Sequence, residues 1–296
     1  MKLILILSLF ISFSLYGKLP IQQTSQIKCK LPSDQRLVIG CTNYCGRFNK
    51  WALKWYARSL GYKLKIVNLR SSKQKLNYTQ VDGILIPGGS DIDPKWYMSK
   101  VTPEFQEYLE KIKNYTNYTK IGKLRDEFEF NLLEDFFSNP NSQYQPILGI
   151  CRGMQVLTAS QGIPLYGDIQ KELGIKNRQY TLDKITITNP ESLISELIGR
   201  KNFKGVELHH QGLNMSYFNK HRENWPQLEV TALSNGDKIA EALEFYDRPI
   251  LGVQFHPEYT FGKPRRNIFK WLLKRACFNK VIGSQLSAKQ TKDKKQ

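Results

Sequence analysis

Short apolar runs alternate with helical patterns along the first half of this chain, and this alternation restricts the fold more than any other feature. Four runs bounded by Gly, Pro or Asn span residues 37–40, 64–67, 83–86 and 147–150. Runs of this length are typical of strands buried in a sheet, and the helices between them can cover both faces of that sheet. The sequence therefore predicts an α/β fold with a mostly parallel central sheet and helices on both faces.

Helical spacing of apolar residues marks three segments near these runs. From Trp51 to Leu60 apolar residues recur every three or four positions, and Gly61 follows as a stop signal. Similar patterns extend from Leu124 to Phe137 and from Met154 to Gly162. The second half predicts four more strands and a closing helix, at residues 181–188, 228–233, 239–245, 250–255 and 267–276.

The chain has 296 residues, of which 41% are apolar, so a core of enzyme size is available. We find no internal repeat, low-complexity linker or P-loop, and we expect one domain over residues 34–279 after an N-terminal extension at 18–33. Residues 95–123, rich in Tyr, Asn and Lys, are predicted to form a surface excursion or lid. Residues 280–296 carry five Lys and one Asp with almost no apolar periodicity, which predicts a basic disordered tail.

The first seventeen residues have the layout of a signal peptide. Lys2 precedes a stretch from Leu3 to Tyr16 that is apolar apart from three serines, and the small residue Gly17 follows. This stretch is shorter than the roughly twenty residues that a spanning helix needs. We therefore expect cleavage near Gly17 and export to a secreted, periplasmic, lysosomal or vacuolar location, with no membrane association of the mature chain. An uncleaved anchor is the alternative.

Lys and Arg outnumber Asp and Glu by 44 to 26, which gives a formal net charge of +18. An excess of this sign favours anionic partners or substrates. No zinc-finger spacing, aromatic RNA-binding run or recognition-helix pattern accompanies the charge, so we expect no nucleic-acid partner.

Five cysteines are present: Cys29, Cys41, Cys45, Cys151 and Cys277. In an exported protein an odd number leaves one thiol unpaired. Two disulfides among the other four would leave Cys151 free, with the pairing open; several reduced, buried cysteines are the alternative. The Cys41-x3-Cys45 pair lacks a second Cys or His pair at zinc-like spacing, so we expect no metal site.

The sequence Gly149-Ile150-Cys151-Arg152-Gly153 follows a predicted strand and opens a predicted helix. In a nucleophile elbow, small residues on both sides permit a strained turn that presents the middle side chain. The helix N-terminus beside it favours the thiolate, which is the reactive form of cysteine. Cys151 is therefore a candidate nucleophile.

A thiolate nucleophile needs a proton carrier, and the chain has four histidines. His256 ends a predicted strand, and Glu258 lies two residues later, a spacing that places both side chains on one side of an extended segment. Glu258 is thus predicted to orient the imidazole, as the third member of a triad does. An ordinary strand exit is the alternative for this His-Pro-Glu sequence.

Acyl transfer also needs hydrogen-bond donors for a developing oxyanion. Gly88 and Gly89 follow a buried strand, and their backbone amides can approach a substrate because no side chain intervenes. With the amide of Arg152, one of them would complete an oxyanion hole. A plain tight turn is the alternative.

Five motifs occur in the order found in a known family, at residues 82–94, 125–129, 146–155, 209–211 and 252–258. They resemble the class I glutamine amidotransferase-like hydrolases, specifically the γ-glutamyl hydrolase branch (peptidase C26) that includes γ-glutamyl-γ-aminobutyrate hydrolase. The resemblance implies a flavodoxin-like glutamine amidotransferase fold. It also implies that Cys151 is the nucleophile, His256 the base and acid, and Glu258 the orienting carboxylate.

The resemblance further implies which groups contact the substrate. By this resemblance Gln155, one helical turn beyond Cys151, contacts the α-amino end of the glutamyl group. The motif His209-His210-Gln211 supplies further candidates. For His209 and His210 two roles are possible, contact with the substrate and packing within the protein. For Arg125 the two possible roles are binding a carboxylate and forming an ion pair at the start of a helix with Asp126 or Glu129.

The activity implied by the resemblance is hydrolysis of a small γ-glutamyl amide through a γ-glutamyl thioester, without a cofactor. Val206-Glu207-Leu208 stands where the aminobutyrate-hydrolase branch usually carries Asn-Ser-x, so the amine that leaves is open. The oligomeric state is also open, with a dimer as one option. The alternative functions are a glutaminase subunit that supplies a separate synthetase and a non-catalytic binding protein for anionic ligands.

Overall fold

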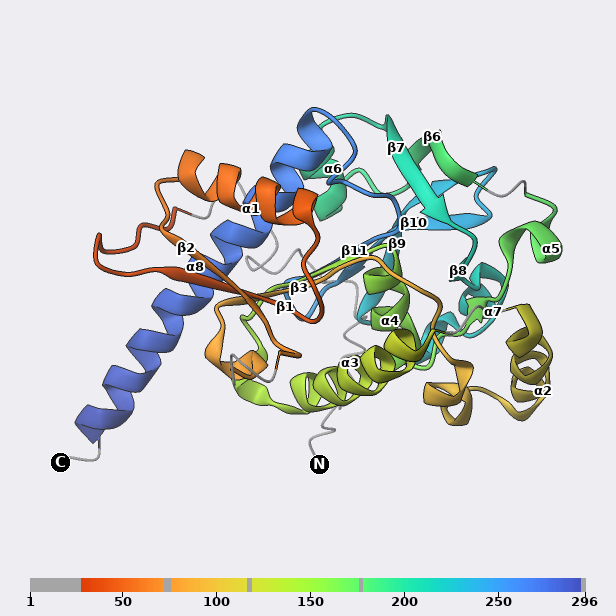
Figure 1. Ribbon diagram of the computed structural model, residues 1–296, viewed down its shortest axis with the longest axis horizontal. Helices are drawn as coiled ribbons and strands as arrows, with labels where there is room; N and C mark the ends of the chain where they lie inside the picture. Colours follow the sequence, from red (N-terminus) through yellow and green to blue (C-terminus); the bar gives the residue numbers. More distant parts are fainter. Residues whose placement is uncertain (1–27, 72–75, 116–118, 176–177, 294–296) are drawn as a thin grey trace, which may run out of the picture.

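The computed structural model of the protein describes residues 28–71, 76–115, 119–175 and 178–293 (Figure 1). The predicted signal peptide, residues 1–17, and the first part of the predicted N-terminal extension lie outside the described residues. Within the described ranges, no helix is both long enough and apolar enough to cross a membrane.

A nine-stranded sheet forms the centre of the molecule. Its strands are β1 (Leu37–Cys41), β2 (Leu64–Asn68), β3 (Gly83–Ile86), β4 (Ile147–Ile150), β6 (Arg178–Ile187), β7 (Asn202–His209), β9 (Leu228–Ser234), β10 (Ile239–Phe245) and β11 (Ile250–Val253). Their order across the sheet is β2-β1-β3-β4-β11-β10-β9-β6-β7. The part from β2 to β11 is parallel, and the strands from β11 to β7 pair antiparallel. The predicted α/β class is confirmed, and the four apolar runs of the first half are β1 to β4 of the parallel part.

Helices cover both faces of this sheet (Figure 1). On one face lie α3 (Lys120–Ser138) and α4 (Arg152–Ser160), and on the other lie α1 (Arg47–Ser59), α6 (Leu193–Ile198) and α8 (Lys263–Asp293). Along β3, Ile84 and Ile86 join the core under α3 and α4, whereas Leu85 joins the core under α1 and α8. Because successive side chains of a strand point to opposite faces, β3 is buried on both sides.

Several shorter elements complete the fold. They are α2 (Pro103–Ile112), α5 (Ile169–Leu173), α7 (Met215–Lys220) and a small sheet of β5 (Leu165–Tyr166) and β8 (Gly212–Leu213). Helix α2 lies within the predicted surface excursion at 95–123, and it buries Leu109 and Ile112. Strand β7 has no counterpart among the elements predicted from the sequence. Its buried positions hold Gly205, Glu207 and His209 beside Phe203, so the apolar alternation that marks a strand is missing.

The closing helix is longer than the sequence predicted. Helix α8 runs from Lys263 to Asp293, so the prediction of a disordered tail is wrong for residues 280–293. The Nζ atom of Lys280 lies 3.2 Å from both carboxylate oxygens of Asp82, and Asn279 donates to the Asp82 carbonyl oxygen at 3.1 Å. These contacts attach the helix to the start of β3 at the point where the sequence analysis ended the domain. Lysines are good helix formers, so a Lys-rich composition is equally compatible with an exposed helix.

Two disulfides join four of the five cysteines. Cys29 is bonded to Cys277 of α8, and Cys41 is bonded to Cys45 in the loop after β1. Cys151 is the cysteine that stays free, as predicted. The pairing, which the sequence left open, follows from which segments meet: the Cys29–Cys277 bond links residues 248 positions apart.

Candidate functional site

Cys151 occupies a sharp turn between β4 and α4. Its backbone has φ 51° and ψ −109°, a conformation that residues with a side chain rarely adopt, so the turn is strained. Glycines on both sides allow the close packing: a Cβ on Gly149 would lie 2.6 Å from Cδ1 of Leu157, and one on Gly153 would overlap the carbonyl oxygen of Ile86. This is the backbone geometry of a nucleophile elbow.

His256 and Glu258 lie beside this turn because β11 and β4 are neighbours in the sheet. The amide of Cys151 donates to the carbonyl oxygen of Val253 at 2.7 Å, so the segments that leave the two strands emerge together. Nδ1 of His256 lies 2.8 Å from Oε1 of Glu258. A Cβ on Gly88 would lie 3.1 Å from Cε1 of His256 and 3.7 Å from Cβ of Cys151. The structure thus brings together four of the residues that the sequence analysis selected.

The imidazole of His256 is buried next to negative groups. Burial opposes its positive form, but the charge and hydrogen bonding of Cys151, and then those of Glu258, outweigh burial and raise the pKa of His256 well above its usual value. A proton held on His256 beside the sulfur suits a thiolate nucleophile, since the same proton can later pass to a leaving group.

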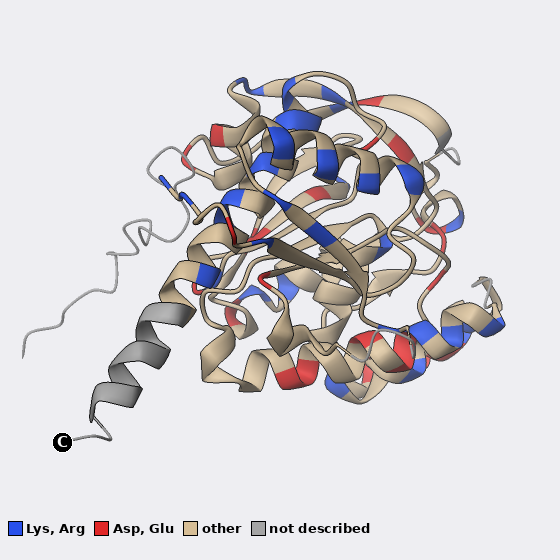
Figure 2. Ribbon diagram, turned by 60° about the vertical axis from the view of Figure 1, so that its left-hand side comes forward, with Lys and Arg blue, Asp and Glu red and all other residues tan. Residues whose placement is uncertain are grey.

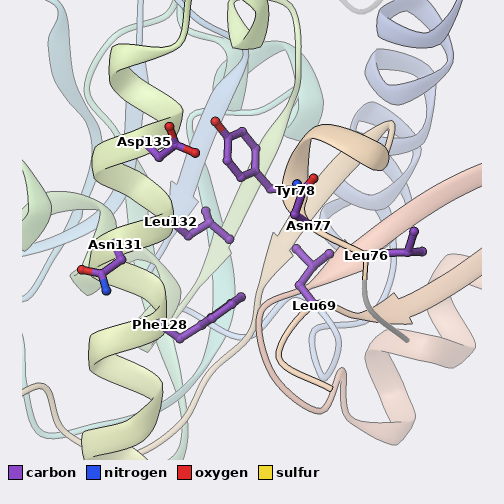
Figure 3. Close-up of a pocket in the computed structure, with 8 residues that line it drawn as sticks. All are labelled: Leu69, Leu76, Asn77, Tyr78, Phe128, Asn131, Leu132 and Asp135. Carbon is purple, nitrogen blue, oxygen red and sulfur yellow. The ribbon is translucent and has the colours of Figure 1, made fainter. Parts of the chain in front are cut away.

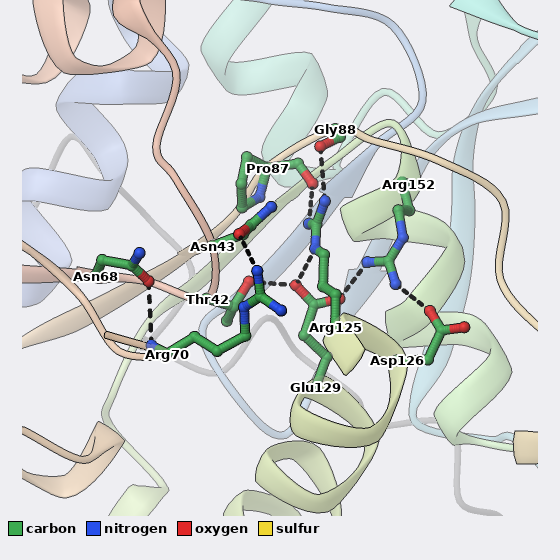
Figure 4. Close-up of polar contacts among 10 residues, drawn as sticks. All are labelled: Thr42, Asn43, Asn68, Arg70, Pro87, Gly88, Arg125, Asp126, Glu129 and Arg152. Carbon is green, nitrogen blue, oxygen red and sulfur yellow. Dashed lines mark hydrogen bonds and ion pairs between the residues drawn. The ribbon is translucent and has the colours of Figure 1, made fainter. Parts of the chain in front are cut away.

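Gly88 and Gly89 form the turn that follows β3. The carbonyl oxygens of Pro87 and Gly88 accept hydrogen bonds from the guanidinium of Arg125, at 2.8 Å in the case of Gly88 (Figure 4). A side chain on Gly89 would overlap that guanidinium. Because the C=O and N–H groups of a trans peptide point in opposite directions, the amides of Gly88 and Gly89 are directed away from Arg125. The contacts with Arg125 therefore leave both amides available for the oxyanion role that the sequence analysis expects.

A buried carboxylate, Glu129 of α3, ties this turn to the elbow (Figure 4). Its Oε1 accepts a hydrogen bond from Nε of Arg125 at 2.8 Å and another from the Thr42 hydroxyl, and its Oε2 pairs with Nη1 of Arg152. Arg152 also pairs with Asp126. Of the alternatives weighed for Arg125, the structure shows the ion pair with Glu129.

Burial alone would favour the neutral forms of these groups. It opposes the charge of Glu129, but Arg125 and Arg152 outweigh it and hold the pKa of Glu129 below its usual value. Burial lowers the pKa of Arg125 to about 10, so this guanidinium stays protonated near neutral pH. For Asp126 burial outweighs Arg152 and raises the pKa of its carboxyl. The two arginines pair with Glu129 and Asp126, and such pairing is the condition under which buried ionic groups are tolerated.

The glutamines near the elbow form a second hydrogen-bonded group. Nε2 of Gln155 donates to the carbonyl oxygen of Gln211 at 2.9 Å and to Oε1 of Gln254 at 3.2 Å, and Nε2 of Gln211 donates to the Gly167 carbonyl oxygen at 3.3 Å. All three glutamine side chains are buried. The sequence analysis did not single out Gln254, although its position two residues before His256 on an extended segment is a signal that could have indicated it.

His209 and His210 have different surroundings. Nε2 of His209 lies 2.9 Å from Oε2 of Glu207 and its Nδ1 lies 2.8 Å from the carbonyl oxygen of Gln211, so both ring nitrogens are engaged inside the protein. The side chain of His210 is 32% exposed, and its Nε2 lies 2.9 Å from Oδ1 of Asp91. The packing alternative therefore describes His209, whereas His210 keeps access to solvent. Asp91, two residues after Gly89, is a partner that the sequence analysis did not single out.

Glu207, His209 and Glu241 are the one group in the described part of the chain whose ligand atoms could surround a metal ion, all within 4.8 Å of one another. Both nitrogens of His209 already have partners, and Oε1 of Glu241 accepts a hydrogen bond from the Ser234 hydroxyl at 2.7 Å. We assign no metal to this group.

A pocket of about 400 Å³ lies between α3 and the segment that joins β2 to β3 (Figure 3). Its lining residues are Leu69, Leu76, Asn77, Tyr78, Phe128, Asn131, Leu132 and Asp135. None of the residues predicted to act in catalysis or substrate binding lines this pocket, so it is separate from the site at Cys151.

Comparisons with known proteins identify the family and the fold. The family model described as peptidase C26 matches residues 58–258. Protein NtpR of Enterococcus hirae is 30% identical over 190 residues, which cover 61% of this chain and 68% of that protein. The glutamine amidotransferase-like protein YvdE of Lactococcus lactis is 28% identical over 213 residues, covering 69% of this chain and 78% of its own. The crystal structure of a Thermoplasma acidophilum protein assigned to GMP synthase aligns with a TM-score of 0.53 at 19% identity, covering 84% of this chain and 98% of that one, and it shows the shared fold.

Glu129→Gln is expected to lower the free energy of unfolding by about 3–5 kcal/mol, because it leaves two buried guanidinium groups short of a counter-charge. Urea unfolding of the variant measures this loss. Glu127→Gln makes the same change at an exposed position of α3 and is expected to stay within about 0.5 kcal/mol of the wild type. Equal stability of the two variants would contradict the network described above.

Cys151→Ser removes the charge next to His256 while keeping a polar side chain of similar size. The pKa of His256, which that charge raises, is therefore expected to fall, so the ring becomes neutral at a lower pH than in the wild type. An NMR titration of the ring protons measures the midpoint, with His221 as a reference in the same spectra. A midpoint that does not move would show that sulfur and imidazole are uncoupled.

Proposed function

This chain belongs to the peptidase C26 family of glutamine amidotransferase-like hydrolases, and we propose that it hydrolyses γ-glutamyl amide bonds through a thioester on Cys151. Family membership supports the hydrolysis of amide bonds in general. The observation that carries the finer proposal is the position of the one cysteine outside the disulfides, on a strained turn beside the bonded pair of His256 and Glu258.

In the first step the Cys151 thiolate attacks the γ-carbonyl carbon of the substrate. The C–S bond forms as the carbonyl π-electrons move to oxygen, and the amides of Gly88 or Gly89 and of Arg152 stabilise that oxyanion. His256 then gives its proton to the amide nitrogen as the C–N bond breaks. The products of this step are the free amine, the γ-glutamyl thioester and a neutral imidazole.

In the second step the neutral imidazole takes a proton from water, and the resulting hydroxide attacks the thioester carbonyl. The tetrahedral intermediate collapses with cleavage of the C–S bond and releases glutamate. The sulfur leaves as a thiolate beside the newly protonated His256, which is the starting state. Glu258 holds Nδ1 of the ring throughout at 2.8 Å, so that Nε2 faces the reaction.

We propose His210 and Gln155 as the contacts for the α-amino and α-carboxylate groups of the glutamyl residue. His210 is partly exposed and is linked through Asp91 to the Gly88–Gly89 turn. Nε2 of Gln155 is bonded to Gln211 and Gln254, so we assign its Oε1 to the α-amino group. Both ring nitrogens of His209 and the amide nitrogen of Gln211 are bonded within the protein, so we assign these two residues to the wall that carries His210 and Gln155.

We further propose that the mature protein acts outside the cytoplasm. The two disulfides support this location, because such bonds persist in oxidising compartments. They also leave Cys151 as the thiol available for catalysis.

Cys151→Ala and His256→Gln are expected to lower kcat for γ-glutamyl amides by at least about a thousandfold, since the steps above use both groups. The assay measures glutamate released from a panel of γ-glutamyl peptides, γ-glutamyl-aminobutyrate and glutamine. His221→Gln, a histidine outside the site, is the matched control and keeps full activity, and circular dichroism verifies that each variant is folded. Full turnover by Cys151→Ala would overturn the nucleophile assignment. A second result would favour the alternative in which the chain serves as a glutaminase for a synthetase. In that case glutamine is the one substrate of the panel that is hydrolysed, and it is hydrolysed only when a synthetase is present.

A further inference from the structure

Helix α1 has two very different faces. One face packs Ala52, Leu53, Tyr56 and Ala57 into the core shared with α8. On the opposite face Phe48, Trp51 and Trp55 are 47%, 46% and 55% exposed. Three large aromatic side chains thus keep about half of their surface in solvent on one side of a short helix, and exposed apolar groups gathered in one place mark interaction surfaces.

Positive charges lie between these aromatic rings. Arg47, Lys54 and Arg58 are exposed on the same face, and α1 contains no acidic residue. Figure 2, in which this side of the molecule comes forward, shows Lys and Arg along the helix with no Asp or Glu among them. The face is thus both aromatic and cationic.

Two loops extend this surface beyond the helix. Phe261 is 82% exposed and Tyr44 is 64% exposed. The guanidinium carbon of Arg265 lies 4.6 Å from the ring centroid of Phe261 and 5.2 Å from that of Trp51, and Nζ of Lys50 lies 4.1 Å from that of Tyr44. We call the surface formed by the five aromatic residues Tyr44, Phe48, Trp51, Trp55 and Phe261 and the cations among them the α1 face.

A hollow of about 460 Å³ lies at the C-terminal end of the same helix. Its lining residues are Lys54, Arg58, Gly61, Tyr62, Lys63 and Leu64. Three cations and no acidic residue surround it, so its charge is complementary to a phosphate group.

We propose that the α1 face binds the surface of a bilayer that contains anionic phospholipids, with the hollow around a lipid phosphate. Trp and Tyr rings settle at the headgroup level of membranes, and Lys and Arg beside them are attracted to anionic lipids. Binding by side chains that project from a folded helix needs no membrane-spanning segment.

The stacking of the rings favours lipid over nucleic acid as the occupant. Trp51 and Trp55 stack on each other with centroids 5.7 Å apart, and Arg265 lies over Trp51. The faces that a nucleobase would stack on are therefore partly taken. Trp51 and Trp55 are still 46% and 55% exposed, and the exposed parts of their rings can enter a headgroup layer.

The test is co-sedimentation of the full chain with vesicles of phosphatidylcholine alone and of phosphatidylcholine with about 30% phosphatidylserine. The wild type is expected to bind only the second kind, and less so at high salt. Lys54→Gln/Arg58→Gln/Lys63→Gln is expected to weaken binding on the order of a hundredfold, since each basic residue near a membrane contributes roughly fivefold. Trp51→Ala/Trp55→Ala is expected to weaken it about tenfold or more.

Matched charge controls lie on or next to β6 and β7, at the opposite end of the sheet from β2 and β1. Lys184→Gln/Lys201→Gln/Lys204→Gln removes the same charge from exposed positions there. Ile121→Ala/Leu124→Ala removes two exposed apolar side chains of α3, on the other face of the sheet. Both variants are expected to bind like the wild type. Three results would overturn the proposal: no binding to phosphatidylserine vesicles, equal losses in the control variants, or binding of a DNA duplex in place of vesicles. If the protein dimerises in a concentration-dependent way and Trp51→Ala/Trp55→Ala abolishes this, the α1 face binds a second copy of the chain and not a membrane.

Discussion

The Glu129 carboxylate accepts hydrogen bonds or ion pairs from three segments that are far apart in the chain. Thr42 follows β1, Arg125 holds the turn at Gly88, and Arg152 begins the helix after the elbow. Since these groups are buried, none can replace Glu129 by water, and the two guanidinium groups depend on it for charge balance. The positions of both proposed oxyanion donors therefore depend on one side chain that never meets the substrate.

The parallel part of the sheet supplies the second constraint. Because β4 and β11 are neighbours, the residues that follow them leave the sheet together, and a sulfur and an imidazole separated by 105 positions become electrostatically coupled. The strained backbone of Cys151 is tolerated because glycines at 149 and 153 allow Leu157 and Ile86 to pack closely around it. Geometry and charge at this edge thus both favour the step that we propose, the formation of a bond to the sulfur of Cys151.

The α1 face borders the candidate site. Phe48 packs edge-on against Tyr259 with ring centroids 5.0 Å apart, and the centroid of Tyr259 lies 5.6 Å from that of the His256 ring. The two sides of helix α1 therefore differ. One side belongs to the core under the sheet, and the other carries the aromatic and basic side chains next to the candidate site.

Local signals in the sequence determined the strands of the parallel sheet, the elbow around Cys151, the two-residue spacing of His256 and Glu258, and the glycines after β3, because each depends on a few neighbouring residues. The same signals missed β7, whose buried positions hold Glu207 and His209, and they stopped α8 too early, because solvated lysines suit a helix as well as a tail. Only the tertiary structure decided the disulfide pairing, the choice of Glu129 as the partner of Arg125, and the different surroundings of His209 and His210. These depend on which distant segments share a buried space, and the cost of burying a charge or a polar group without a partner then selects the pairs.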